Sequence, residues 1–126
     1  TLSEYFIELT GITQERFDRE GADFAEVLRD FVEFAGPGTI IYSNGGDEKN
    51  LYENCGYYGV ICPLGIDRFR NLSAFLSAEA HATCHVETGT LDEVFGIPSD
   101  LPAHDGLADA RKLAGTIRHL RQHGRM

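Results

Sequence analysis

A histidine and an aspartate near the C-terminal end, His104 and Asp109, are the residues of this chain whose types and spacing best suit chemistry. On one regular helix their side chains would point about 140° apart, because each residue advances the helix by about 100°. If the helix instead begins at about Asp105 or Gly106, His104 precedes it and can fold back over the first turn, from which Asp109 projects. The imidazole and the carboxylate would then converge at a helix N-terminus, where backbone N–H groups and the helix dipole favour anions such as phosphate.

The amphipathic segment that follows, to about Arg121, must position these two side chains. Apolar residues recur in it at helical spacing. The spacing predicts a helix whose buried side is formed by Leu107, Ala110, Ala114, Ile117 and either Leu120 or the stem of Arg121.

Asp47 is a second candidate, because it follows a short apolar run and a glycine turn, Ser43-Asn44-Gly45-Gly46. The run Thr39-Ile40-Ile41-Tyr42 predicts a buried strand over 39–42. A helix then begins at Asp47 and ends at Gly56, with Leu51, Tyr52 and Cys55 turned inward. Open α/β sheets build their sites beyond the C-terminal ends of strands, so Asp47 is placed as a ligand, with an ordinary helix cap as the alternative. Asn44 either contacts a nucleotide or simply makes the turn.

The other elements are predicted from capping signals and periodicity. A short helix and a loop occupy 1–14, and a helix with an Asp23/Glu26 capping box covers 23–35. Residues 57–66 form a second short strand or extended piece, Asp67 caps a helix that ends near Glu79, and Thr90 with Glu93 caps a short helix that stops at Gly96.

Composition predicts one folded domain over residues 1–126. The apolar content is 42%, and no apolar run approaches membrane-spanning length. The chain is therefore expected to have no membrane partner. Three cysteines without framework spacing predict free, buried thiols in a reducing, cytoplasmic setting. The net charge of −9 argues against broad coating of nucleic acid, which requires many Lys and Arg side chains on phosphates.

The predicted strands are too few for an α/β sheet of ordinary size. Two short strands accompany five or six helical pieces, and a strand over 39–42 without neighbours would leave unpaired edges. The fold class is therefore predicted as α/β with part of its sheet missing.

Three stretches together resemble the DEDDh-type 3′–5′ exonucleases, most closely the exoribonucleases of the RNA-interference-regulating and sporulation-inhibitor type. They are Leu9-Thr10-Gly11-Ile12-Thr13, then Ser43-Asn44-Gly45-Gly46-Asp47 with Leu51 and Cys55 behind it, and His104-x4-Asp109. The resemblance implies a ribonuclease H-like fold and two divalent cations, Mg²⁺ or Mn²⁺, held by four acidic residues. It also implies a single-stranded RNA or DNA 3′ end as substrate, with RNA favoured.

The roles of single residues follow from the same resemblance. Asp47 matches the aspartate of the second motif and Asp109 that of the third, both metal ligands, and His104 matches the general base. Thr10, Gly11 and Ile12 match the loop that approaches the terminal nucleotide. The residue types suit the chemistry, since hard cations bind carboxylate oxygens and an imidazole can take a proton from the attacking water.

The first motif of that family, Asp-x-Glu on the first strand, has no counterpart here. It should lie some tens of residues before the Leu-Thr-Gly-Ile loop, whereas only nine residues precede Thr10. Asp18-Arg19-Glu20 follows the loop in a polar stretch without a strand, so we reject it. The first three strands and two of the four metal ligands are therefore expected to be absent from residues 1–126, which predicts that this chain alone is inactive. The alternative is a catalytically dead homologue that serves as an interaction module and dimerises through the exposed edge of strand 39–42.

Overall fold

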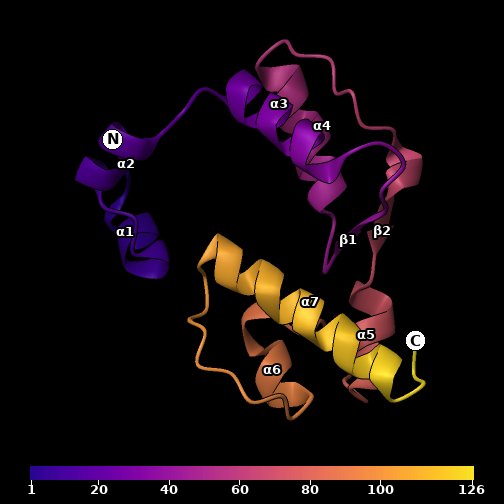
Figure 1. Ribbon diagram of the computed structural model, residues 1–126. Coiled ribbons are helices and arrows are strands. Elements are labelled where there is room, and N and C mark those ends of the chain that lie inside the picture. Colours follow the sequence, from indigo (N-terminus) through magenta and orange to yellow (C-terminus); the bar gives the residue numbers. More distant parts are fainter. The chain divides into compact units, whose positions relative to one another are not determined.

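The computed structural model describes residues 1–126 and shows a mixed α/β chain that is mostly helical (Figure 1). The α-helices are α1 (Glu4–Thr10), α2 (Gln14–Glu20), α3 (Phe24–Ala35), α4 (Asp47–Tyr57), α5 (Ser73–Glu79), α6 (Leu91–Val94) and α7 (Gly106–Gln122). The 3₁₀ turn η1 (Ile66–Arg68) precedes the strand β2 (Phe69–Asn71), and the 3₁₀ turn η2 (Thr88–Thr90) precedes α6. The strand β1 (Ile41–Ser43) precedes α4.

The chain divides into two compact units. One comprises residues 1–19 and 74–126, and the other comprises residues 20–73. This division does not decide whether residues 1–126 form the single domain that was predicted, so that domain stays a prediction.

The only sheet consists of β1 and β2, which pair in parallel with Ile41 opposite Phe69 and Ser43 opposite Asn71. The strand predicted at 39–42 is thus present, shifted toward Ser43. Of the two alternatives predicted for 57–66, the strand is absent and residues 60–65 form a connecting piece without helix or strand. The second strand begins instead at Phe69, inside the stretch that was predicted as a helix from Asp67.

Arg68 explains why the chain extends after η1 instead of continuing as a helix. Its Nε donates to the Thr39 carbonyl at 2.9 Å and its Nη2 to the Gly36 carbonyl at 2.7 Å, both just before β1. These bonds align the two segments, and the strand pairing then satisfies the backbone groups that a helix would have used. Helix α5 consequently begins only at Ser73.

Most helices lie near their predicted positions, whereas their caps differ. Helix α3 matches the predicted range 23–35, but the side chain of Asp23 makes no capping hydrogen bond. Thr90 precedes α6 as predicted, yet its hydroxyl donates to the Glu87 carbonyl at 2.9 Å instead of capping the helix. Both predicted capping boxes are therefore wrong in detail. Helix α2 was not predicted at all.

The core of the unit 20–73 is small. Leu28 of α3, Cys55 of α4 and Leu64 of the following loop are almost fully buried. The Phe24 and Tyr58 rings stack with their centroids 5.0 Å apart. Helix α4 begins at Asp47 and buries Cys55 as predicted, although it continues past Gly56 to Tyr57.

Helix α7 provides the core of the other unit, where it packs on η2 and α6. Its buried residues are Ala108, Lys112, Leu113, Thr116, Ile117 and Leu120. The predicted burial of Ile117 and Leu120 is confirmed, whereas Leu107, Ala110 and Ala114 are exposed. The helix is rotated relative to the prediction because Lys112 and Thr116, which are polar, lie on the buried side.

None of the helices combines the length and the hydropathy that a membrane crossing requires.

Two leucines of α7 test this rotation. Leu120 has no exposed surface, while Leu107 is 62% exposed. We expect Leu120→Ala to lower the free energy of unfolding by about 2–5 kcal/mol, because it removes buried methyl groups and leaves a cavity. Leu107→Ala should change it by less than about 0.5 kcal/mol. Urea denaturation followed by circular dichroism measures both values, and similar losses for the two variants would contradict the observed orientation of α7.

Candidate functional site

The beginning of α7 lies where the sequence predicted it. Asp105 has an extended backbone and is the N-cap, with its Oδ1 accepting a hydrogen bond from the Ala108 amide at 2.9 Å. Its carbonyl accepts from the Asp109 amide at 2.8 Å, which closes the first turn. The cap satisfies one of the amides that a helix start leaves unpaired, so the position of Asp109 is set by the helix itself.

His104 immediately precedes this cap and has an unusual backbone. Its φ is +59°, in the left-handed region, and only one other non-glycine residue, His81, has a positive φ. This conformation costs roughly 1–3 kcal/mol, and such residues gather at functional sites. The imidazole is exposed, and no hydrogen bond or ion pair joins it to Asp109. The predicted convergence of the two side chains is therefore not made by a direct contact.

Asp109 lies on the buried side of α7 and not on its solvent side. It is three residues before Lys112 and four before Leu113, so the three side chains share one face of the helix. Its Oδ1 is buried and has no hydrogen-bond partner in the protein. A carboxylate oxygen removed from water in this way is costly unless a cation, a proton or an ordered water accompanies it.

Asp47 is the first residue of α4 and is exposed, directly after the glycine turn. The next residue, Glu48, is half-buried, and its Oε2 is a second carboxylate oxygen that is buried without a hydrogen-bond partner. Sequence reasoning singled out Asp47 alone. The structure adds Glu48, because the first turn of α4 directs one acid to solvent and part of the other away from it.

The turn between β1 and α4 is held by the end of the neighbouring strand. Asn71 Oδ1 accepts from the Gly45 amide at 3.0 Å and from the Ser73 amide at 2.9 Å. Buried Ser43 donates its hydroxyl to the Gly45 carbonyl at 2.9 Å. Asn44, the predicted nucleotide contact, is half-buried within this turn. Asn71 thus fixes the segment that carries Asn44 and Asp47, and sequence reasoning had overlooked it.

Thr10, Gly11 and Ile12 form the C-terminal cap of α1. Gly11 has φ +72°, and its amide donates to the Ile7 carbonyl at 2.8 Å. The Thr10 hydroxyl donates to the Phe6 carbonyl at 2.8 Å and accepts from the Ile12 amide at 3.1 Å. These bonds account for the local structure of the three residues. Their predicted role at a terminal nucleotide stays a prediction.

The rejected Asp18-Arg19-Glu20 stretch lies at the end of α2, so the absence of a strand around it is confirmed. Asp18 accepts from Gln14 Nε2 at 2.8 Å and Arg19 pairs with Glu15, as expected for the solvent side of a helix.

The sequence-predicted residues fall into separate parts of the chain. His104, Asp109 and the Thr10–Ile12 turn belong to the unit 1–19 and 74–126, whereas Asn44 and Asp47 belong to the unit 20–73. No three His, Cys, Asp or Glu side chains of residues 1–126 lie close enough to hold one metal ion together.

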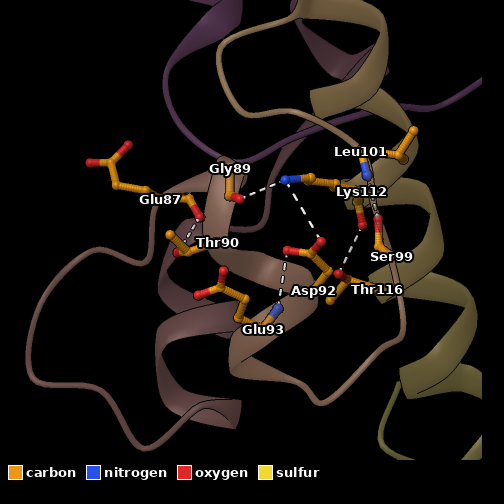
Figure 2. Close-up of polar contacts among 9 residues, drawn as sticks. All are labelled: Glu87, Gly89, Thr90, Asp92, Glu93, Ser99, Leu101, Lys112 and Thr116. Atoms are coloured by element: carbon orange, nitrogen blue, oxygen red, sulfur yellow. Dashed lines mark hydrogen bonds and ion pairs between the residues drawn. The ribbon is translucent and has the colours of Figure 1, made fainter.

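A buried ion pair in the unit that contains α7 was missed entirely (Figure 2). Lys112 Nζ donates to the Gly89 carbonyl at 2.7 Å and lies 3.7 Å from Asp92 Oδ2, and both side chains are at least nine-tenths buried. Asp92 Oδ1 accepts from the Glu93 amide at 3.0 Å. Neither Asp92 nor Lys112 was singled out from the sequence. The available signal was the spacing of Lys112 from Thr116 and Leu120, which share one helix face.

Comparison with models of known families, with curated proteins and with solved structures finds no match to this chain.

The buried pair is tested by removing one charge. We expect Asp92→Ala to lower the free energy of unfolding by about 3–5 kcal/mol, because it leaves the Lys112 ammonium buried without a counter-charge. The double variant Asp92→Leu with Lys112→Met should recover most of this loss, since it leaves no charge unpaired. Glu53→Ala serves as the control, because its pair with Lys49 is exposed and should contribute less than about 1 kcal/mol. Urea titrations give all three values, and a loss no larger for Asp92→Ala than for Glu53→Ala would refute the role of the pair.

Proposed function

We propose that residues 1–126 are part of a metal-dependent 3′–5′ exonuclease of the DEDDh type, with a ribonuclease H-like fold of which these residues form the C-terminal two thirds. The observation that carries the proposal is the Asp109 carboxylate, whose Oδ1 is buried without a hydrogen-bond partner. It follows by five residues a histidine with a strained backbone. A cation ligand and a base at this spacing are what the resemblance requires of His104 and Asp109.

In this proposal, the carboxylates that the resemblance assigns to the cations, Asp109 and Asp47, lie in different units of the chain. Mg²⁺ and Mn²⁺ bind carboxylate oxygens, and the Asp109 Oδ1 without a partner would gain one. By the resemblance, Asp47 of the unit 20–73 would also be a cation ligand, and Glu48, with its own buried oxygen, follows it in the sequence. When bound, two such cations activate a water and stabilise the charge on the attacking and leaving oxygens of a phosphodiester. The remaining two acids must come from outside residues 1–126.

His104 would accept the proton of the attacking water. Its imidazole is exposed and can therefore reach both the substrate and bulk solvent, to which the proton is returned. Asp105 would act as a positioning residue, because its cap on the Ala108 amide fixes the chain direction directly after His104.

The substrate would be the 3′ end of a single strand of RNA, or of DNA. The net charge of −9 leaves little electrostatic attraction for a long duplex, so contact with the terminal phosphate would depend on the cations held by Asp47 and Asp109. Two of the five basic residues in the last sixteen positions are already engaged, Lys112 with Asp92 and Arg125 with Glu79 at 2.6 Å. Because Lys112 is buried and Arg125, beyond the end of α7, is paired, fewer basic groups face solvent than the sequence suggests, which favours an end-binding mode over binding along a strand.

The nuclease proposal is tested on the full product of the coding frame that contains residues 1–126. With Mg²⁺ or Mn²⁺ and a 5′-labelled single-stranded oligoribonucleotide, we expect stepwise shortening from the 3′ end. Asp109→Asn and His104→Ala should each slow it by at least about 100-fold, because they remove a cation ligand and a proton acceptor. Asp100→Asn, in an exposed loop, is the matched control and should leave the rate unchanged.

Residues 1–126 alone should show no substantial degradation in the same assay, since half of the carboxylates are missing. Strong Mg²⁺-dependent degradation by this chain, abolished by Asp109→Ala, would contradict the incomplete site. A full product that is inactive, and in which Asp109→Asn changes no measured property, would overturn the nuclease proposal itself.

A second candidate is a catalytically dead homologue that acts as an interaction module. The observation that favours it is the two-stranded sheet, because β1 pairs with β2 on one side and has no strand on its other side. Unpaired strand edges promote association between chains. A second copy that adds its own β1 would extend the sheet without any catalytic role.

The sheet edge is tested by the mass of the chain in solution. We expect sedimentation equilibrium to show dimers of residues 1–126 that dissociate on dilution. Ile40→Lys, directly before β1, should shift the equilibrium toward monomers at least about tenfold, because a charge at a strand edge opposes pairing. Ile66→Lys, 70% exposed and outside the sheet, is the control. Monomers at all concentrations for the unmodified chain would exclude association through this edge.

A further inference from the structure

Two of the three cysteines lie on the same side of α4 within the unit 20–73. Cys55 is in the last part of α4 and is 3% exposed, whereas Cys62 lies in the following loop and is half-buried. The third, Cys84, is exposed and belongs to the other unit. Cys55 and Cys62 are therefore the only two thiols within one unit.

One carbonyl oxygen places Cys62 against α4. The Leu64 carbonyl accepts a hydrogen bond from the Tyr52 hydroxyl and one from Cys62 Sγ at 3.7 Å. Tyr52 and Cys55 are three residues apart and occupy neighbouring positions on the helix face. The side chain of Cys62 thus lies beside the same face of α4 that carries Cys55.

The backbone of the loop that contains Cys62 is also hydrogen-bonded to Cys55. The Val60 amide donates to the Cys55 carbonyl at 2.8 Å, and Gly59 supplies the left-handed turn that this return requires, with φ +65°. Burial, followed by the electrostatic and hydrogen-bonding interactions with Cys62, raises the pKa of the Cys55 thiol. The Leu64 carbonyl shared by Tyr52 and Cys62, together with the Val60–Cys55 bond, thus holds the Cys62 segment against the part of α4 that carries Cys55.

We propose that Cys55 and Cys62 form a reversible disulfide when a small-molecule disulfide of the glutathione type is the oxidant. The half-buried Cys62 thiolate attacks one sulfur of the oxidant, which releases one thiolate and leaves a mixed disulfide on Cys62. Cys55 then attacks Cys62 Sγ, its proton passes to the departing thiolate, and the second thiol leaves. Two protein thiols and one small disulfide thus become one protein disulfide and two small thiols.

The disulfide would fasten one wall of an apolar pocket. Val60, Ile61 and Pro63 line one side of a pocket of about 330 Å³, and α3 residues that include Leu28 and Val32 line the other. Because Cys62 lies between Ile61 and Pro63, the oxidised and reduced states differ in how firmly this wall is held. The modification site is independent of any nuclease activity.

Peptide mapping of the full chain tests the proposal. Trypsin places Cys55 and Cys62 together in the peptide Asn50–Arg68 and Cys84 in the peptide Asn71–Arg111. After treatment with oxidised glutathione and denaturing alkylation, we expect the first peptide to lack both alkyl groups and to be lighter by two hydrogen atoms. Dithiothreitol should restore alkylation of both residues.

Single variants identify the order of the steps. Cys55→Ser should accumulate a stable glutathione adduct on Cys62, whereas Cys62→Ser should leave buried Cys55 unmodified. Cys84→Ser is the matched control and should give the same oxidised peptide as the unmodified chain. Glutathione that stays on Cys62 of the unmodified chain while Cys55 is still alkylated would overturn the proposal, and so would a disulfide from either residue to Cys84.

Discussion

The contact on which the arrangement of α7 depends is the buried pair of Lys112 and Asp92. A buried ammonium must be matched by a counter-charge and a hydrogen bond, and only one rotation of the helix brings Lys112 to both Asp92 and the Gly89 carbonyl. That rotation places Leu113, Ile117 and Leu120 inward and Leu107 outward. It also turns Asp109 toward the packed side. The position of the candidate ligand is therefore a consequence of a charge pair one helical turn away.

The parts of the fold that were predictable are those that local signals determine. The apolar periodicity of α3 and the glycine turn before Asp47 place their elements correctly, because each signal lies within a few residues of the structure it specifies. The second strand was misplaced because β2 depends on Arg68 binding carbonyls some thirty residues earlier in the chain. Nothing within 66–72 reveals such a partner.

The candidate site was predictable to a similar degree. The start of α7 at about Asp105 or Gly106 was anticipated from residue types, whereas the N-cap role of Asp105 was not assigned. The burial of an Asp109 oxygen could not be anticipated in this way, since it depends on the rotation of the helix and hence on Lys112. Glu48 and Asn71 were overlooked for the same reason. Glu48 is next to Asp47, which seemed better placed, and Asn71 lies in a stretch that was predicted as a helix. The roles of both residues become visible only from their tertiary contacts.

The oxygen of Asn71 has a further consequence for how the unit 20–73 opens. It is shared by two amides, Gly45 after β1 and Ser73 at the start of α5, so a displacement of the Asn71 side chain releases both amides together. Their protection against hydrogen exchange should therefore be correlated, with both amides exposed in the same opening event. The turn that carries Asp47 is then as stable locally as β2 beside it. It should open when β1 and β2 separate.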